Sequence, residues 1–307
     1  MRDCIVVGAG ASGLSGALVL GRAQRSTLVV DAGSQSNLAS EAIGGLLGND
    51  HRAPRDFYAG CRAELERYPA VELRKGEVTG AERDGDGFVV TLSDGSTERS
   101  RRILLATGMN YRAPDIEGVE GRWGRSVFHC PFCHGWEHRG KVLGVLEDGS
   151  SGVDRAVMLR AWSDKVTLYT NGRGAPDRDS AGRLENLGVT VEERPITALR
   201  GEAPDLTSVD FTEGEPRACD GMLVPVTLHQ RSGLANMLDA ESAEPGHLSE
   251  ETLEVDATAE TTARGVFAAG DLTTQAPSVP HAIASGTAAG GVIVRDLMDE
   301  DSRRGSR

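Results

Sequence analysis

A glycine-rich turn near the N-terminus constrains the fold of this chain more than any other feature. The apolar run from Cys4 to Val7 leads into Gly8-Ala9-Gly10-Ala11-Ser12-Gly13, and a second apolar run, 14–20, follows at once. This order predicts a strand, a tight turn and a helix. Asp31, which ends the next apolar run, lies 18 residues after Gly13. The pattern is typical of α/β folds in which glycines and a helix N-terminus approach a pyrophosphate and an acid meets a ribose hydroxyl.

The rest of the chain predicts two such units. Residues 103–105 form an apolar strand that ends in a small-residue turn, and 265–269 form another before a helix at about 280–297. Between them, 114–228 shows its own strands and helices. The fold class predicted is therefore α/β, with two Rossmann-like three-layer nucleotide-binding domains, the second inserted into the first. The first domain comprises 1–113 and 229–307, and the inserted unit comprises 114–228.

Two segments lack a regular pattern. Residues 33–55 are rich in Gly, Ser and Asn and predict a long loop, whose role the sequence leaves open. Residues 300–307 are polar, and we expect them to be disordered.

Charge and hydropathy narrow the classes of partner. The net charge of −13 argues against nucleic acid and against an anionic membrane surface. No apolar run approaches the roughly 20 residues that a membrane-spanning helix needs. The N-terminus runs straight into a predicted strand, without a secretory signal, so we expect a cytoplasmic protein that binds neither nucleic acid nor membrane.

The chain has five cysteines, and one pair has a spacing that carries chemistry. Cys130 and Cys133 form a Cys-x-x-Cys pair, which can close a disulfide, bind a metal or do neither. Zinc would need a second pair of ligands, which the sequence lacks, so no metal site is predicted. His134 follows directly and can move protons during thiol–disulfide exchange. We expect the remaining cysteines to be inert thiols: Cys4, Cys61 and Cys219.

Taken together, these motifs resemble the low-molecular-weight thioredoxin reductase family of FAD-dependent disulfide oxidoreductases. The resemblance covers nearly the whole chain and implies FAD as cofactor, a homodimer formed through the FAD domains, and a redox pair at Cys130 and Cys133. The family more often has Glu where Asp31 stands. The implied FAD-binding residues are Gly8, Gly10, Ala11, Ser12, Gly13, Asp31, Ala106, Thr107, Gly108, Gly270, Asp271, His281 and Ala282.

The chain departs from the family at its second nucleotide site. Where ordinary members have glycines against the pyrophosphate of NADPH, this chain has Glu147 and Asp148. Like charges some 4 Å apart repel by roughly 4 kcal/mol at an effective dielectric constant of about 20. The arginine cluster that grips the 2′-phosphate is also missing, with Arg173 as its only candidate. We therefore expect a degenerate NADPH site.

The residues around the cysteines resemble those of the dithiol oxidase branch of the family, because His134 stands where reductases usually have Asp. Members of that branch close disulfides in small dithiols such as holomycin and gliotoxin precursors and pass the electrons to O2, which becomes H2O2. The resemblance implies that Cys130 exchanges with the substrate, that Cys133 faces the flavin and that His134 is the general base. The alternatives are a disulfide reductase fed by NADPH or another donor, and a non-catalytic flavoprotein sensor or binding subunit.

Three further side chains keep two interpretations each. Phe132 and Trp136 form either an apolar floor for the substrate or part of the core. His281 either faces the flavin or is a polar residue at a helix end. His129 precedes the cysteine pair, and we expect it to be structural.

Overall fold

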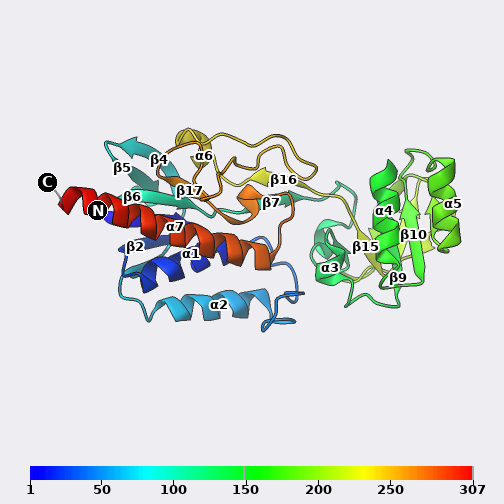
Figure 1. The fold of residues 1–307 in the computed structure, drawn as a ribbon. Helices are drawn as coiled ribbons and strands as arrows, with labels where there is room; N and C mark the ends of the chain where they lie inside the picture. Colours follow the sequence, from blue (N-terminus) through cyan, green and yellow to red (C-terminus); the bar gives the residue numbers. More distant parts are fainter. Residues whose placement is uncertain (148, 306–307) are drawn as a thin grey trace. The chain divides into compact units, whose positions relative to one another are not determined.

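The computed structural model describes residues 1–147 and 149–305, and the chain divides into two compact units (Figure 1). The first comprises Met1–Leu38, Pro54–Tyr111 and Leu228–Arg307, and the second comprises Ala39–Ala53 and Arg112–Thr227. The segment 39–53, which the sequence placed with the first domain, therefore belongs to the second unit.

The first unit is built on a mainly parallel sheet. Strands β3, β2, β1 and β6 lie side by side in that order, β17 pairs with the end of β6, and β5 and β4 extend the sheet as an antiparallel hairpin. Four residues of β1 are buried in succession, as is typical of a parallel sheet covered on both faces. Strands β7 and β16 form a separate two-stranded sheet. The elements are β1 Arg2–Val7, α1 Ala11–Arg22, β2 Thr27–Asp31, α2 Pro54–Leu65, β3 Val71–Lys75, β4 Val78–Asp84, β5 Gly87–Leu92, β6 Thr97–Leu105, β7 Met109–Arg112, β16 Thr227–Gln230, α6 Leu234–Met237, β17 Val266–Ala268, η2 Gly270–Thr273 and α7 Val279–Gly305.

Parallel pairing brings the predicted turns of this unit to one edge of its sheet. Val7, the last residue of β1, is in register with Leu105 of β6, and Leu105 is in register with Ala268 of β17. Val7 is also in register with Val30 of β2. The segments that follow β1, β2, β6 and β17 consequently lie together at the carboxyl ends of the strands, where ligands of open α/β sheets bind.

The second unit repeats the same order of strands. Its parallel sheet runs β11, β10, β9, β15, β8, with α4 connecting β9 to β10 and α5 connecting β10 to β11. Strands β12, β13 and β14 form a small antiparallel sheet that the sequence did not predict. In Figure 1, α4 lies along the sheet beside β9 and β10. The elements are η1 Glu120–Arg122, β8 Val127–Phe128, α3 Pro131–His134, β9 Val142–Leu146, α4 Gly149–Leu159, β10 Lys165–Tyr169, α5 Arg178–Asn186, β11 Thr190–Glu192, β12 Ile196–Arg200, β13 Ser208–Phe211, β14 Arg217–Ala218 and β15 Gly221–Leu223.

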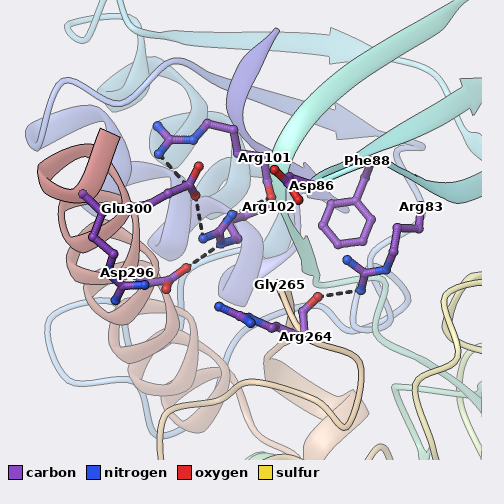
Figure 2. A pocket seen from close by; sticks show the side chains of 11 residues that line it. Arg83, Asp86, Phe88, Arg101, Arg102, Arg264, Gly265, Asp296 and Glu300 are labelled. Carbon is purple, nitrogen blue, oxygen red and sulfur yellow. Dashed lines mark hydrogen bonds and ion pairs between the residues drawn. The ribbon is translucent and has the colours of Figure 1, made fainter. Parts of the chain in front are cut away.

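The C-terminal helix α7 packs along α1 and continues further than the sequence predicted. We expected disorder from residue 300, but the helix runs to Gly305 because its polar end is tied to the sheet. Arg101 bonds Asp301, and Arg102 forms ion pairs with Asp296 and Glu300. Arg101, Arg102, Asp296 and Glu300 line a pocket of about 410 Å³, and Figure 2 shows the ion pairs that cross from β6 to α7. None of the predicted FAD-binding residues lines this pocket.

Within the described part of the chain, no helix combines the length and the apolar character required to cross a membrane.

Removal of one arginine tests this C-terminal network. We expect Arg102→Met to lower the free energy of unfolding by about 1–3 kcal/mol, because Asp296 and Glu300 lose a partly buried partner. Arg99→Met is the matched control, since Arg99 lies on the same strand in an exposed pair with Asp84 and should cost less than about 1 kcal/mol. Denaturant titration of both variants measures the difference, and equal losses would contradict the network's role.

The same network predicts how acid affects stability. Burial raises the pKa of Glu300, but Arg101 and Arg102 outweigh it and hold that pKa below its ordinary value. The carboxylate therefore stabilises the fold above the unfolded-state pKa of about 4.3 and loses this contribution as the pH falls towards the folded-state pKa. The loss of unfolding free energy caused by Arg102→Met should accordingly become smaller below about pH 4.

Candidate functional site

The turn after β1 is closed by contact between backbones. Gly8 has φ +106°, and a Cβ added there would lie 2.3 Å from the carbonyl oxygen of Ala106. A Cβ on Gly13 would lie 1.9 Å from the carbonyl oxygen of Gly8. Only glycine fits at either position, and the close approach places the first turn of α1 directly at the sheet edge.

The N-terminus of α1 suits an anionic group. Gly10 precedes the helix, no side chain among the described residues caps it, and the first turn holds no acid. A Cβ on Gly10 would meet no atom of the described structure within 4 Å, so this side of the turn is open. Uncapped amides and the helix dipole favour a phosphate there. Ala11 and Ser12, also predicted to bind FAD, are the first two residues of this helix.

Asp31 ends β2 at the same edge, as predicted, but its carboxylate already has several partners. One oxygen accepts hydrogen bonds from the amide of Gly33 at 2.8 Å and from Gln35 at 3.1 Å. The other accepts from Arg62 Nε at 2.9 Å and pairs with a second guanidinium nitrogen at 2.7 Å. A carboxylate has about four acceptor positions, so a ribose hydroxyl must share or replace one of these bonds. The sequence did not reveal Arg62.

The turns after β6 and β17 complete this edge. Ala106 is buried and donates its amide to Val7, while Thr107 and Gly108 follow it into the turn. Asp271 follows Gly270, whose amide bonds Ser285 of α7.

The surroundings of Asp271 shift the pKa of its carboxyl group. Burial raises its pKa above the ordinary value, although the hydroxyl of Tyr111, which donates to it at 2.9 Å, and the nearby His281 and Arg231 oppose the increase. Tyr111 is a residue that the sequence analysis missed, because β7 and η2 are far apart in the chain. His281 itself is exposed in the first turn of α7, and Ala282 beside it is buried.

The cysteine pair lies at the end of β8 in the second unit and is closed in a disulfide. Cys130 precedes the short helix α3, and Pro131 fills its first position, where a missing N–H costs nothing. Cys133 donates its amide to the carbonyl of Cys130 at 3.3 Å. The turn therefore holds both sulfur atoms in one loop that follows a parallel strand.

His134 is packed against the same loop. Its ring stacks on Phe128, with the centroids 5.4 Å apart, and Nδ1 is buried without a hydrogen-bond partner of good geometry among the described residues. Burial lowers its pKa, while the carbonyls of Cys130 and Gly124 and the charge of Glu137 partly compensate. Burial also lowers the pKa of the neighbouring His129 to about 4. Both imidazoles are therefore neutral at neutral pH, as a general base must be.

The aromatic residues that flank the cysteines are on the surface. Phe132 is 71% exposed and Trp136 is 56% exposed, so the structure rejects the core interpretation of both. Phe132 meets Trp162 edge to face, and the guanidinium of Arg139 lies 4.1 Å from the centre of a Trp136 ring. Leu47, from the segment 39–53, is fully exposed as well.

The turn between β9 and α4, where the sequence predicted that carboxylates repel a pyrophosphate, contains a carboxylate whose charge is paired. Glu147 is paired with Arg155 at 2.7 Å and accepts a hydrogen bond from Ser151, so its charge is offset. Arg155 also donates to the carbonyls of His129 and Val224 and thereby joins this turn to the segment before Cys130. Asp148, the other predicted carboxylate, lies outside the described residues.

The other cysteines match their predicted inert state in two of three cases. Cys4 and Cys219 are buried, and burial raises the pKa of each thiol to about 12. Cys61 is only half-buried. Among the described residues, no group of three or more His, Cys, Asp or Glu side chains is arranged to hold a metal ion.

The two Rossmann-like units, the glycine turn and the disulfide define a two-domain nucleotide-dependent disulfide oxidoreductase. Residues 2–286 match the family of pyridine nucleotide-disulphide oxidoreductases, and the chain belongs to that family. It is 31% identical to the thioredoxin reductase tcpT of Claviceps purpurea, over 96% of this chain and 94% of that protein. The fold is the thioredoxin reductase-like α/β fold predicted from the sequence.

Two solved structures are similar over nearly their whole length. The crystal structure of HlmI has a TM-score of 0.92 and 34% identity, and covers 100% of this chain and 95% of that one. An oxidoreductase from Agrobacterium tumefaciens has a TM-score of 0.90 and 35% identity, with 97% and 98% covered. These relationships confirm the predicted resemblance and the predicted cofactor: the chain is a thioredoxin reductase-like flavoprotein that binds FAD.

The open side of the glycine turn gives a test of where FAD binds. We expect Gly10→Ala to fold normally but to bind FAD at least about tenfold more weakly, because the new Cβ enters the space in front of the α1 amides. Flavin content after purification and titration of the flavin-free protein measure the effect. Gly182→Ala is the control, since a Cβ there also meets no described atom within 4 Å but lies on α5 of the other unit. Wild-type FAD affinity in Gly10→Ala would contradict the assignment.

Proposed function

We propose that the protein is an FAD-dependent dithiol oxidase that closes an intramolecular disulfide in a small-molecule dithiol. The disulfide between Cys130 and Cys133, beside the neutral imidazole of His134, supports thiol–disulfide exchange. The similarity to HlmI supports a place in the dithiol oxidase branch. The exposed rings of Phe132 and Trp136 flank the pair and suit an apolar or planar substrate.

Thiol–disulfide exchange transfers two electrons from the substrate dithiol to the disulfide of the enzyme. A substrate thiolate attacks Cys130, the bond between Cys130 and Cys133 breaks, and a mixed disulfide forms. The second substrate thiolate then displaces Cys130, so the substrate leaves as a cyclic disulfide and the enzyme keeps two reduced cysteines. When bound, FAD would supply the two-electron acceptor through which the bond between Cys130 and Cys133 re-forms, with O2 as the final acceptor and H2O2 as its product.

His134 has the properties that deprotonation of the substrate requires. Because its pKa is lowered, the ring stays neutral below the ordinary histidine pKa of about 6.5. It can therefore accept a thiol proton over a wider range of pH than an exposed histidine.

The direction of electron flow is supported by one observation, the ion pair between Glu147 and Arg155. The carboxylate stands just before α4, where a phosphate binds in nucleotide-holding βαβ units, and Arg155 and Ser151 already satisfy it. A pyrophosphate would have to displace this internal anion. An oxidase needs no nicotinamide donor, so the occupied turn favours the oxidase over the NADPH-dependent reductase.

The reductase remains the second candidate, because curated relatives such as tcpT are named thioredoxin reductases. In addition, the first turn of α4 is rich in glycine and serine and carries no acid.

Oxygen consumption decides between the two functions. We expect small dithiols to drive O2 uptake and H2O2 formation in equal amounts, and Cys130→Ser to abolish turnover while it retains FAD. Anaerobic addition of NADPH should leave the flavin oxidised. Rapid bleaching by NADPH, followed by reduction of a disulfide substrate, would instead establish the reductase.

Replacement of His134 tests the proposed base. We expect His134→Ala to lower dithiol turnover by roughly 100-fold near neutral pH, with the loss diminishing at alkaline pH, where substrate thiols ionise unaided. Turnover unchanged from about pH 6 to 9 would rule out the assignment.

The proposal includes a cytoplasmic homodimer with no nucleic acid or membrane partner. Cys4 and Cys219, which form no disulfide, suit a reducing compartment.

A further inference from the structure

The segment 39–53 packs within the second unit, against the loop that carries the disulfide. A Cβ added to Gly44 would lie 2.5 Å from the carbonyl oxygen of Cys133 and 3.2 Å from its Cα. Only a glycine allows the segment to approach the cysteine backbone so closely. The loop that the sequence left without a role therefore contacts the redox pair itself.

Two further contacts fix this segment on both sides of Gly44. Glu41 pairs with Arg125, and His51 lies 3.5 Å from the carboxylate of Glu137. Arg125 comes shortly before β8, and Glu137 comes shortly after α3. The segment is thus held to the residues that precede and follow the cysteine turn.

Ser40 brings a hydroxyl to the proposed base. Its Oγ lies 3.4 Å from Nε2 of His134, which is long for a hydrogen bond but within reach of one. The ring is held on one face by Phe128, and Ser40 is the one side chain of the described residues that bonds it. A neutral imidazole carries its proton on one nitrogen, and the partner of the other nitrogen selects which one.

We propose that the segment 39–53 is a working part of the redox centre and that Ser40 is a positioning residue, which orients the His134 ring and sets its tautomer. The proposal deepens the function proposed above and rests on His134 as its base. Ser40 does not exchange a proton with the substrate; it acts through the imidazole. Gly44 serves the same role indirectly, because it lets the segment bring Ser40 within reach.

Other charged groups surround the imidazole, and the test must separate Ser40 from them. The charge of Glu137, which lies in the cysteine loop, acts on His134. The rings of His129 and His138 also interact electrostatically with His134. The segment adds Glu41 and His51, each with its own partner. A variant that alters only the attachment of the segment is therefore the necessary control.

The experiment compares Ser40→Ala, Ser40→Thr and Glu41→Gln in the FAD-loaded protein. Ser40→Thr keeps the hydroxyl, and Glu41→Gln weakens the segment's exposed pair with Arg125 without touching His134. The first readout is the ¹⁵N spectrum of the His134 ring in the oxidised protein, assigned with His134→Ala. The second is the pH dependence of cysteine alkylation by iodoacetamide after reduction with a phosphine. Neither readout requires a substrate or O2, so both readouts still test the role of Ser40 if the protein proves not to be an oxidase.

We expect Ser40→Ala to change the tautomer ratio of His134 and to move the midpoint of the alkylation profile by about 0.5 pH unit or more, with Ser40→Thr and Glu41→Gln close to wild type. A Ser40→Ala protein with an unchanged His134 spectrum and an unchanged profile would overturn the proposal. Equal shifts in Ser40→Ala and Ser40→Thr would also overturn it, because Ser40→Thr keeps the hydroxyl and a shift in both would reduce Ser40 to a packing residue. Loss of O2 uptake in wild type, with the Ser40 effects intact, would refute the oxidase and leave the positioning role standing.

Discussion

The pairing of β6 with β1 on one side and β17 on the other is the constraint on which the first unit depends. Three turns separated by about 100 and 160 residues of sequence meet because Leu105 is in register with both Val7 and Ala268. The contact between Gly8 and Ala106 closes the edge at backbone distance. Substitution of a side chain into that contact would separate the first turn of α1 from the sheet, and with it the amides that suit a phosphate.

The second unit uses the same strand order for different chemistry. At the corresponding turn after β9, the chain supplies its own anion, Glu147, and its own cation, Arg155. Arg155 then bonds the carbonyl of His129, the residue before Cys130. A turn that binds a nucleotide in related folds is here joined, through the ion pair between Glu147 and Arg155, to the segment that carries the disulfide.

The local motifs were predictable from the sequence because each depends on neighbouring residues. The glycine turn, Asp31 after β2 and the Cys-x-x-Cys loop all follow from short patterns of strand, turn and helix. The partners were not predictable, since they come from distant segments: Tyr111 for Asp271, and Arg62 for Asp31. The polar composition of residues 300–307 predicted disorder, yet residues 300–305 continue α7, and arginines of β6 pair with Glu300 and Asp301; residues 306–307 lie outside the described part of the chain.

The segment 39–53 shows why composition alone misassigned a loop. Its glycines and serines predicted a long loop without an assigned role, and its position in the chain predicted membership of the first domain. Gly44 is instead required for contact with Cys133, and Ser40 is the residue that reaches His134. A loop poor in apolar side chains gains its position from close backbone approach and a few polar bonds, none of which leaves a periodic pattern. The cysteine loop is thus contacted by residues about 90 positions away in sequence, as the separation of Ser40 from His134 illustrates.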